Sequence, residues 1–238
     1  MALTGGDLDV DLKSLTYDPA ETAGLKLKYD VDLQLRRGVC SRPDLPFPIN
    51  DLSAQISLSD GLLTLHRADG YNGSTHVKAE GAMTMGAPET APLNLRLDVI
   101  DLPLDQRLKD RTPADYLELW DVFQPKGRVN ARVEIVRDRE GGELDLGATV
   151  FCRDVSGLYR HFPYPLKNLN GRLALKGNEL TVDLRGPIGD KPARMWGTVL
   201  NPGPDAVVDL NVTAESVPID EVFLNALDDE VRPWVDRF

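Results

Sequence analysis

Apolar and polar residues alternate along most of this chain with a period of two, which is typical of a half-buried β-strand. In residues 25–35, leucine, tyrosine and valine occupy the odd positions, whereas charged residues or glutamine occupy the even ones. The dipeptide Asp60–Gly61 separates two alternating runs and is a strong hairpin signal. The pattern predicts a mainly β protein with antiparallel strands. The runs are residues 8–12, 25–35, 52–58, 63–65, 77–81, 93–99, 129–135, 144–152, 169–175, 180–184, 195–199 and 208–214.

The whole pattern occurs twice, at a spacing of roughly 115 residues. Phe47–Leu52 returns as Tyr164–Leu169, and Gly81 returns as Gly197. A repeat of short strands is typical of a stacked β architecture. We therefore predict two tandem meander repeats of about five strands each, at residues 1–125 and 126–238.

Each copy ends in a segment that loses the alternation and takes a helical spacing. We expect helix from Pro113 to Phe123 and from Pro218 to Ala226. Asp105 and Asp220 closely follow prolines, where an aspartate can cap a helix start. Trp120 returns as Trp234. We expect both tryptophans to pack the helical segment onto the sheet rather than to contact a ligand.

An antiparallel sheet with one apolar face must cover that face. Two architectures satisfy this requirement. In a sandwich or barrel, the apolar faces cover each other. In an open, curved sheet with short helical crossings, they form a groove that another molecule fills.

The net charge of the chain is −11. This argues against nucleic acid as a partner, and against binding to an anionic membrane by charge alone. Cys40 and Cys152 are not at equivalent places in the two copies, and we expect buried thiols rather than a disulfide. No apolar run approaches the length of a membrane span, and the first residues do not resemble a signal peptide. We expect the chain to be a piece of a longer protein.

The sequence contains no candidate catalytic site. His66, His76 and His161 lack metal-ligand spacing with the two cysteines, and Ser156 lacks the strand–turn–helix setting of a serine hydrolase. The acidic runs are expected to be solvated faces. We therefore expect no enzyme activity, no catalytic residue, no metal and no cofactor.

Several segments resemble the AsmA-like family of bacterial envelope proteins, a branch of the repeating β-groove, bridge-type lipid transfer superfamily. They are PLKNLNGRLAL at 165–175, LTVDLRG at 180–186, VPID at 217–220 and the junction WDVFQPKGRV at 120–129. The resemblance implies a periplasmic protein that an N-terminal helix, outside this chain, anchors in the inner membrane. It also implies an apolar groove that carries phospholipid between membranes.

With this resemblance, the open groove is the favoured architecture. We predict a non-enzymatic lipid transfer segment whose partners are phospholipid or another acyl-chain lipid, and a membrane reached through segments outside this chain. Self-association end to end is a further expectation. The alternative is a structural or adhesive tandem β-sandwich without a lipid ligand. The predicted groove-lining residues are Leu27, Val31, Leu33, Ala54, Ile56, Leu58, Leu95, Leu97, Val133, Ile135, Leu146, Ala148, Leu173, Leu175, Leu210 and Val212.

Overall fold

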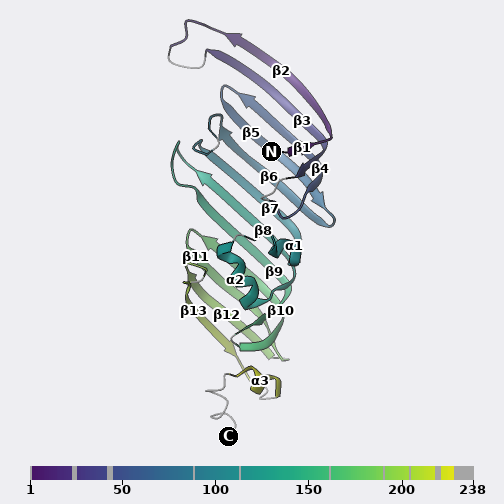
Figure 1. Cartoon of the computed structure of the whole chain (residues 1–238), viewed down its shortest axis with the longest axis vertical. Coiled ribbons are helices and arrows are strands. Elements are labelled where there is room, and N and C mark those ends of the chain that lie inside the picture. Colours follow the sequence, from purple (N-terminus) through teal and green to yellow (C-terminus); the bar gives the residue numbers. More distant parts are fainter. Residues whose placement is uncertain are drawn as a thin grey trace. The chain divides into compact units, whose positions relative to one another are not determined.

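The computed structural model of the chain describes residues 2–22, 26–41, 45–87, 89–112, 114–160, 162–189, 191–203, 205–217 and 221–227. Their strands follow one another as an antiparallel meander in one open sheet (Figure 1). The mainly β, open-sheet prediction is confirmed, and the sandwich alternative is wrong because the described strands belong to a single sheet. The strands are β1 (Ala2–Thr4), β2 (Asp7–Tyr17), β3 (Leu27–Ser41), β4 (Ile49–Ser59), β5 (Leu62–Asn72), β6 (Thr75–Thr84), β7 (Leu93–Pro103), β8 (Lys126–Arg137), β9 (Asp145–Tyr159), β10 (Phe162–Lys176), β11 (Glu179–Ile188), β12 (Lys191–Leu200) and β13 (Val207–Ala214).

The first two strands together form one broken edge strand. β1 pairs with residues 39–41 of β3, whereas β2 pairs with residues 27–36 of the same strand. The break falls at Gly5 and Gly6, whose φ angles are 71° and 91°. The described strands therefore occupy twelve positions, six in each copy of the repeat. The expectation of about five strands per copy was too low.

The chain forms two compact units. Unit 1 comprises residues 1–101 and 131–148, and unit 2 comprises residues 102–130 and 149–238. Both β8 and β9 contribute residues to each unit. The predicted division at 1–125 and 126–238 concerns the repetition of sequence and stays a prediction.

Strand pairing repeats together with the sequence. A row of cross-strand partners in unit 1 consists of Ile56, Leu65, Gly81 and Leu95. The sequence repeat gives an equivalent row in unit 2, which consists of Leu173, Val182, Gly197 and Leu210. Residues that correspond in sequence therefore have corresponding partners in space.

Backbone irregularities recur with the same period. Three pairs of non-glycine residues, with partners 115 to 117 residues apart, have left-handed φ angles. In unit 1, the strand register shifts near two of them, which is the signature of β-bulges. Bulges bend a strand, so unit 1 bends at these points, and unit 2 has the same left-handed backbone at the equivalent residues. The pairs are Arg37 and Asp154 (56° and 54°), Asp51 and Asn168 (50° and 51°), and Asp101 and Ser216 (61° and 54°).

Among the described residues, three short helices lie outside the sheet: α1 (Gln106–Lys109), α2 (Ala114–Phe123) and α3 (Glu221–Ala226). The Asp105 side chain accepts a hydrogen bond from the Leu108 backbone N–H at 3.2 Å and caps α1, as predicted. Asp220 and Trp234 lie outside the described residues. None of the helices in the described ranges is long and apolar enough to cross a membrane.

The two cysteines are free thiols. Cys40 is buried and Cys152 is half-buried, in agreement with the prediction that they are not joined. Burial raises the pKa of the Cys152 thiol, so this group stays protonated and unreactive at neutral pH.

Candidate functional site

One face of the unit 1 sheet carries apolar side chains on every strand from β2 to β7. The strand register places three successive rows on this face, and no charged or amide side chain interrupts them. The first row is Leu8, Leu35, Ala54, Ala68, Ala79 and Leu97; the second is Val10, Leu33, Ile56, Leu65, Gly81 and Leu95; the third is Leu12, Val31, Leu58, Leu63, Met83 and Leu93.

Unit 2 has a matching apolar face. Its three rows cross β10, β11, β12 and β13 and again contain apolar residues and glycine alone. The rows are Gly171, Leu184, Met195 and Val212; Leu173, Val182, Gly197 and Leu210; and Leu175, Leu180, Val199 and Val208.

These faces are only thinly covered. At the two edge strands, Val10 is 61% exposed and Val208 is 59% exposed. Among the described residues, no large side chain is less than 2% exposed. The chain exposes 15302 Å², whereas a compact 26.3 kDa monomer exposes about 10,600 Å². A second layer that would bury these faces is missing from the described part of the chain.

Part of the unit 1 face is covered by its own side chains. Leu35, Ala54 and Ala68 are buried, and Ile56 and Leu65 pack against them. Leu52 and Ala79 also pack against this cluster, so the face covers part of its own surface. This arrangement is a shallow apolar layer one side chain thick.

Twelve of the sixteen predicted lining residues lie on these faces by strand register. Eight belong to unit 1: Leu27, Val31, Leu33, Ala54, Ile56, Leu58, Leu95 and Leu97. Four belong to unit 2: Leu173, Leu175, Leu210 and Val212.

The other four predicted residues lie on β8 and β9. Arg132 of β8 bonds Asp98 on the polar side of β7, with Nε and Oδ1 2.7 Å apart. Val133 and Ile135 alternate with charged residues of β8, which places them on the apolar side. Leu146 and Ala148 share one side of β9, and Leu146 is 39% exposed.

The apolar rows extend beyond the predicted set. The apolar rows also contain residues of strands that the alternation had already indicated, such as Leu63, Leu65, Met83, Val182 and Val199. The signal for them was therefore present in the sequence. Their places in the rows required the register, which alternation within a single strand does not give.

A glycine lies at the same place in the second row of each unit. A Cβ atom added to Gly81 would collide with the carbonyl oxygen of Asn94 on the next strand. One added to Gly197, whose φ is +148°, would collide with the carbonyl oxygen of Asp209. Glycine inside a strand often marks such a close approach of backbones. These two positions therefore hold neighbouring strands closely together on the apolar face.

The polar face of unit 1 contains a cluster that the sequence did not reveal. Asp69, which is 8% exposed, forms an ion pair with Arg67, and its Oδ1 lies 3.1 Å from His76 Nε2. The Arg67 guanidinium, assisted by His76 and opposed by burial, holds the pKa of Asp69 below its ordinary value. The His76 ring stacks on Tyr71 with centroids 4.4 Å apart.

This cluster borders a cavity of about 180 Å³ on β3, β4 and β5. The Asp69 carboxylate already contacts Arg67 and His76. The Thr75 hydroxyl donates a hydrogen bond to the Asp101 backbone carbonyl. The described residues contain no group of three histidine, cysteine or acidic side chains that could hold a metal. Asp69 therefore links β5 to β6, and we assign this residue a structural role.

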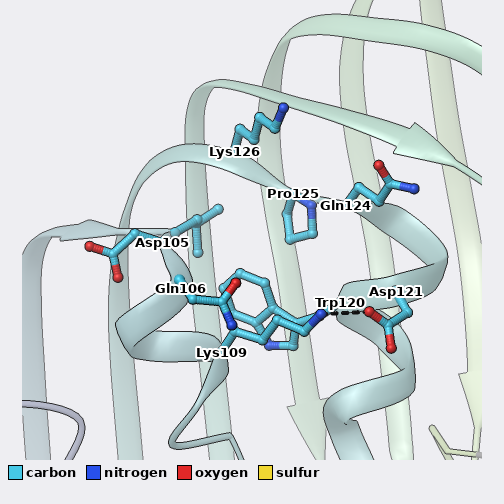
Figure 2. A pocket seen from close by; sticks show the side chains of 9 residues that line it. Asp105, Gln106, Lys109, Trp120, Asp121, Gln124, Pro125 and Lys126 are labelled. Atoms are coloured by element: carbon cyan, nitrogen blue, oxygen red, sulfur yellow. Dashed lines mark hydrogen bonds and ion pairs between the residues drawn. The ribbon is translucent and has the colours of Figure 1, made fainter.

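A second hollow, of about 420 Å³, lies between α1, α2 and the start of β8 (Figure 2). Lys109 of α1 and Asp121 of α2 form an ion pair across it, with Nζ and Oδ1 2.5 Å apart. Trp120 is half-buried and faces this hollow, where it packs between the two helices. The lining residues are Leu104, Asp105, Gln106, Lys109, Trp120, Asp121, Gln124, Pro125 and Lys126.

Comparison of the chain with protein-family models, with curated proteins and with solved structures found no match. The candidate site is therefore assigned on its geometry alone: two apolar sheet faces, each with recurrent register and each largely open.

Proposed function

We propose that this chain is a non-enzymatic lipid-binding segment whose apolar faces shelter the acyl chains of phospholipid or a similar lipid. The observation that carries the proposal is the set of apolar rows, which recur in both units and lack a covering layer in the described residues. Monomeric soluble proteins rarely leave an apolar patch of this extent open, and such patches commonly mark binding sites.

Acyl chains suit these faces chemically. Each methylene group that leaves water for an apolar surface contributes about 0.8 kcal/mol. The face of unit 1 crosses six strand positions from β2 to β7, so at about 4.8 Å per strand step it extends roughly 24 Å. This is the scale of an extended acyl chain lying across the strands. The charged opposite face supports solubility.

Transfer between membranes is the finer part of the proposal. It rests on the resemblance to the AsmA-like family. In that setting the chain is periplasmic, segments outside it provide the membrane anchor, and lipid moves along the groove by partitioning. Catalysis, a cofactor and nucleic acid have no part in it.

The test uses a fluorescent phospholipid, nitrobenzoxadiazole-labelled phosphatidylethanolamine, whose emission rises in an apolar site. The double variant Ile56→Asp/Leu175→Asp places one carboxylate on the apolar face of each unit. The matched control Ser57→Asp/Ala174→Asp places the same groups one residue away, on the polar faces.

We expect the first variant to lose at least ten-fold in affinity for the labelled lipid and the control to bind as the unaltered chain does. Both proteins should stay folded by circular dichroism, because an aspartate on an open face keeps water. Two outcomes contradict the proposal: equal binding by the two variants, or unfolding of the first variant, which would indicate a closed core.

A further inference from the structure

The two outermost strands of the described sheet each have one unpaired side. Among the described residues, β13 pairs with β12 alone and β2 pairs with β3 alone. A strand with a free row of backbone N–H and C=O groups is a template for pairing with another chain. The sequence repeat identifies which strand can pair with each of these edges.

Within the chain, the strand equivalent to β13 is already paired on that side. The partners Gly81 and Leu95 make β7 the counterpart of β13, where Gly197 pairs with Leu210. In the chain, β7 pairs with β8. The free side of β13 therefore corresponds to the side of β7 that pairs with β8.

The strand equivalent to β2 is the one that makes this contact. Both β2 and β8 precede a strand of 15 residues, β3 and β9, and those two strands carry the equivalent left-handed residues Arg37 and Asp154. Thus β2 of the first copy is equivalent to β8 of the second copy. The free side of β2 corresponds to the side with which β8 contacts β7.

We propose that a second copy of this chain pairs its β2 with β13 of the first and reproduces the internal contact between β7 and β8. The strands pair antiparallel, and the apolar side of β13, which carries Val208 and Val212, comes beside the apolar side of β2, which carries Val10 and Leu12. All four residues are more than half exposed in the single chain. Different surfaces meet, so the contact is head-to-tail and open-ended. This inference rests on the sheet topology and not on the proposed lipid function.

Charge argues against the symmetric alternative. Pairing of β2 with β2 would bring Asp7, Asp9 and Asp11 of one copy towards the same residues of the other, and like charges on facing strands are destabilising. Ion pairs of Asp7 with Arg37 and of Asp9 with Arg36 reduce this repulsion, and Asp11 retains it. The polar side of β13 carries a single acid, Asp209, between Val207 and Thr213. The heterologous pair therefore has the lower electrostatic cost.

The test uses two blocked variants, because lysines on an edge strand hinder pairing. One variant is Val10→Lys/Leu12→Lys on β2 and the other is Val208→Lys/Val212→Lys on β13. The control Leu62→Lys replaces a 46% exposed leucine on the polar side of an interior strand. Sedimentation velocity over a hundred-fold concentration range reports association, and thermal unfolding confirms that each protein is folded.

We expect the unaltered chain and the control to associate with rising concentration, and each blocked variant to be at least ten-fold weaker. An equimolar mixture of the two blocked variants should form dimers and nothing larger, because one free β13 and one free β2 remain. A monomeric unaltered chain would overturn the proposal. So would a β13 variant that still dimerises, which indicates β2–β2 pairing, or a mixture that stays monomeric.

Discussion

Units 1 and 2 agree on one face of the sheet and differ on the other. On the apolar face, each position of the three rows is apolar in both units, and a glycine recurs at Gly81 and Gly197. On the polar face, Asp69 pairs with Lys78 and Lys78 with Asp98 in unit 1. The equivalent place in unit 2 has Arg185 opposite Arg194.

The polar face of unit 2 has its own arrangement. Arg194 donates to Asp183 over 3.0 Å, and its guanidinium lies 5.1 Å from the centre of the Trp196 ring. The Arg194 hydrogen bond lowers the pKa of Asp183, with Arg185 and Arg172 adding to the effect. Unit 1 thus alternates charges across strands, whereas unit 2 gathers arginines around one carboxylate.

This difference indicates where the repeat is constrained. The polar faces need only be hydrated, so different charge patterns serve equally well. The apolar faces retain apolar character at every row position and the close backbone approach at Gly81 and Gly197, although the sizes of corresponding side chains differ. This is expected when both copies bind the same kind of molecule. The comparison therefore supports a shared apolar surface as the functional one.

The largest effect is expected at the recurrent glycine. Gly197→Ala should lower the free energy of unfolding by about 3 kcal/mol or prevent folding, because a Cβ collides with the Asp209 carbonyl and φ is +148°. Gly86→Ala is the matched control, since a Cβ there meets nothing within 4 Å. Urea denaturation measures both. Equal stability of the two variants would show that the strands do not need this close approach.

A smaller effect is expected on the polar face. Folding lowers the pKa of Asp69, so its stabilising contribution is present above its ordinary pKa of 3.8 and is lost as the pH falls below that value. Asp69→Asn should lower stability by about 1 kcal/mol at pH 7 and flatten the acid limb of the stability curve. Urea denaturation between pH 2 and pH 7 provides the measurement.

Asp183→Asn is the comparison for this prediction. The Asp183 side chain is 43% exposed and that of Asp69 is 11% exposed, so solvent screens the first ion pair more strongly. We expect Asp183→Asn to change stability less than Asp69→Asn. The reverse order would show that the arginine cluster of unit 2 matters more than the buried carboxylate of unit 1.

Alternation and turn residues could predict the strands because they are local signals. The hairpin at Asp60–Gly61, the cap at Asp105 and the recurrence of Gly81 as Gly197 all follow from short segments. The sequence alone left open whether the apolar faces meet each other, because this depends on how the sheet closes. Nothing in the local pattern decides that.

Features that depend on register were not predictable. Arg37 has a left-handed φ of 56° although arginine gives no turn signal, and its place becomes clear only from the register shift between β3 and β4. Asp69 and His76 meet because β5 and β6 pair with a one-residue bulge between Leu65 and Ala68. Cross-strand neighbours of this kind need the full pairing of the sheet.

The lipid-binding proposal is tested most directly by native mass spectrometry of the purified chain after addition of phospholipid. We predict complexes whose extra mass equals one or more phospholipid molecules, and their loss in the Ile56→Asp/Leu175→Asp variant while the Ser57→Asp/Ala174→Asp control retains them. A spectrum that contains only the bare polypeptide, at the gentlest conditions and with lipid in excess, would contradict it.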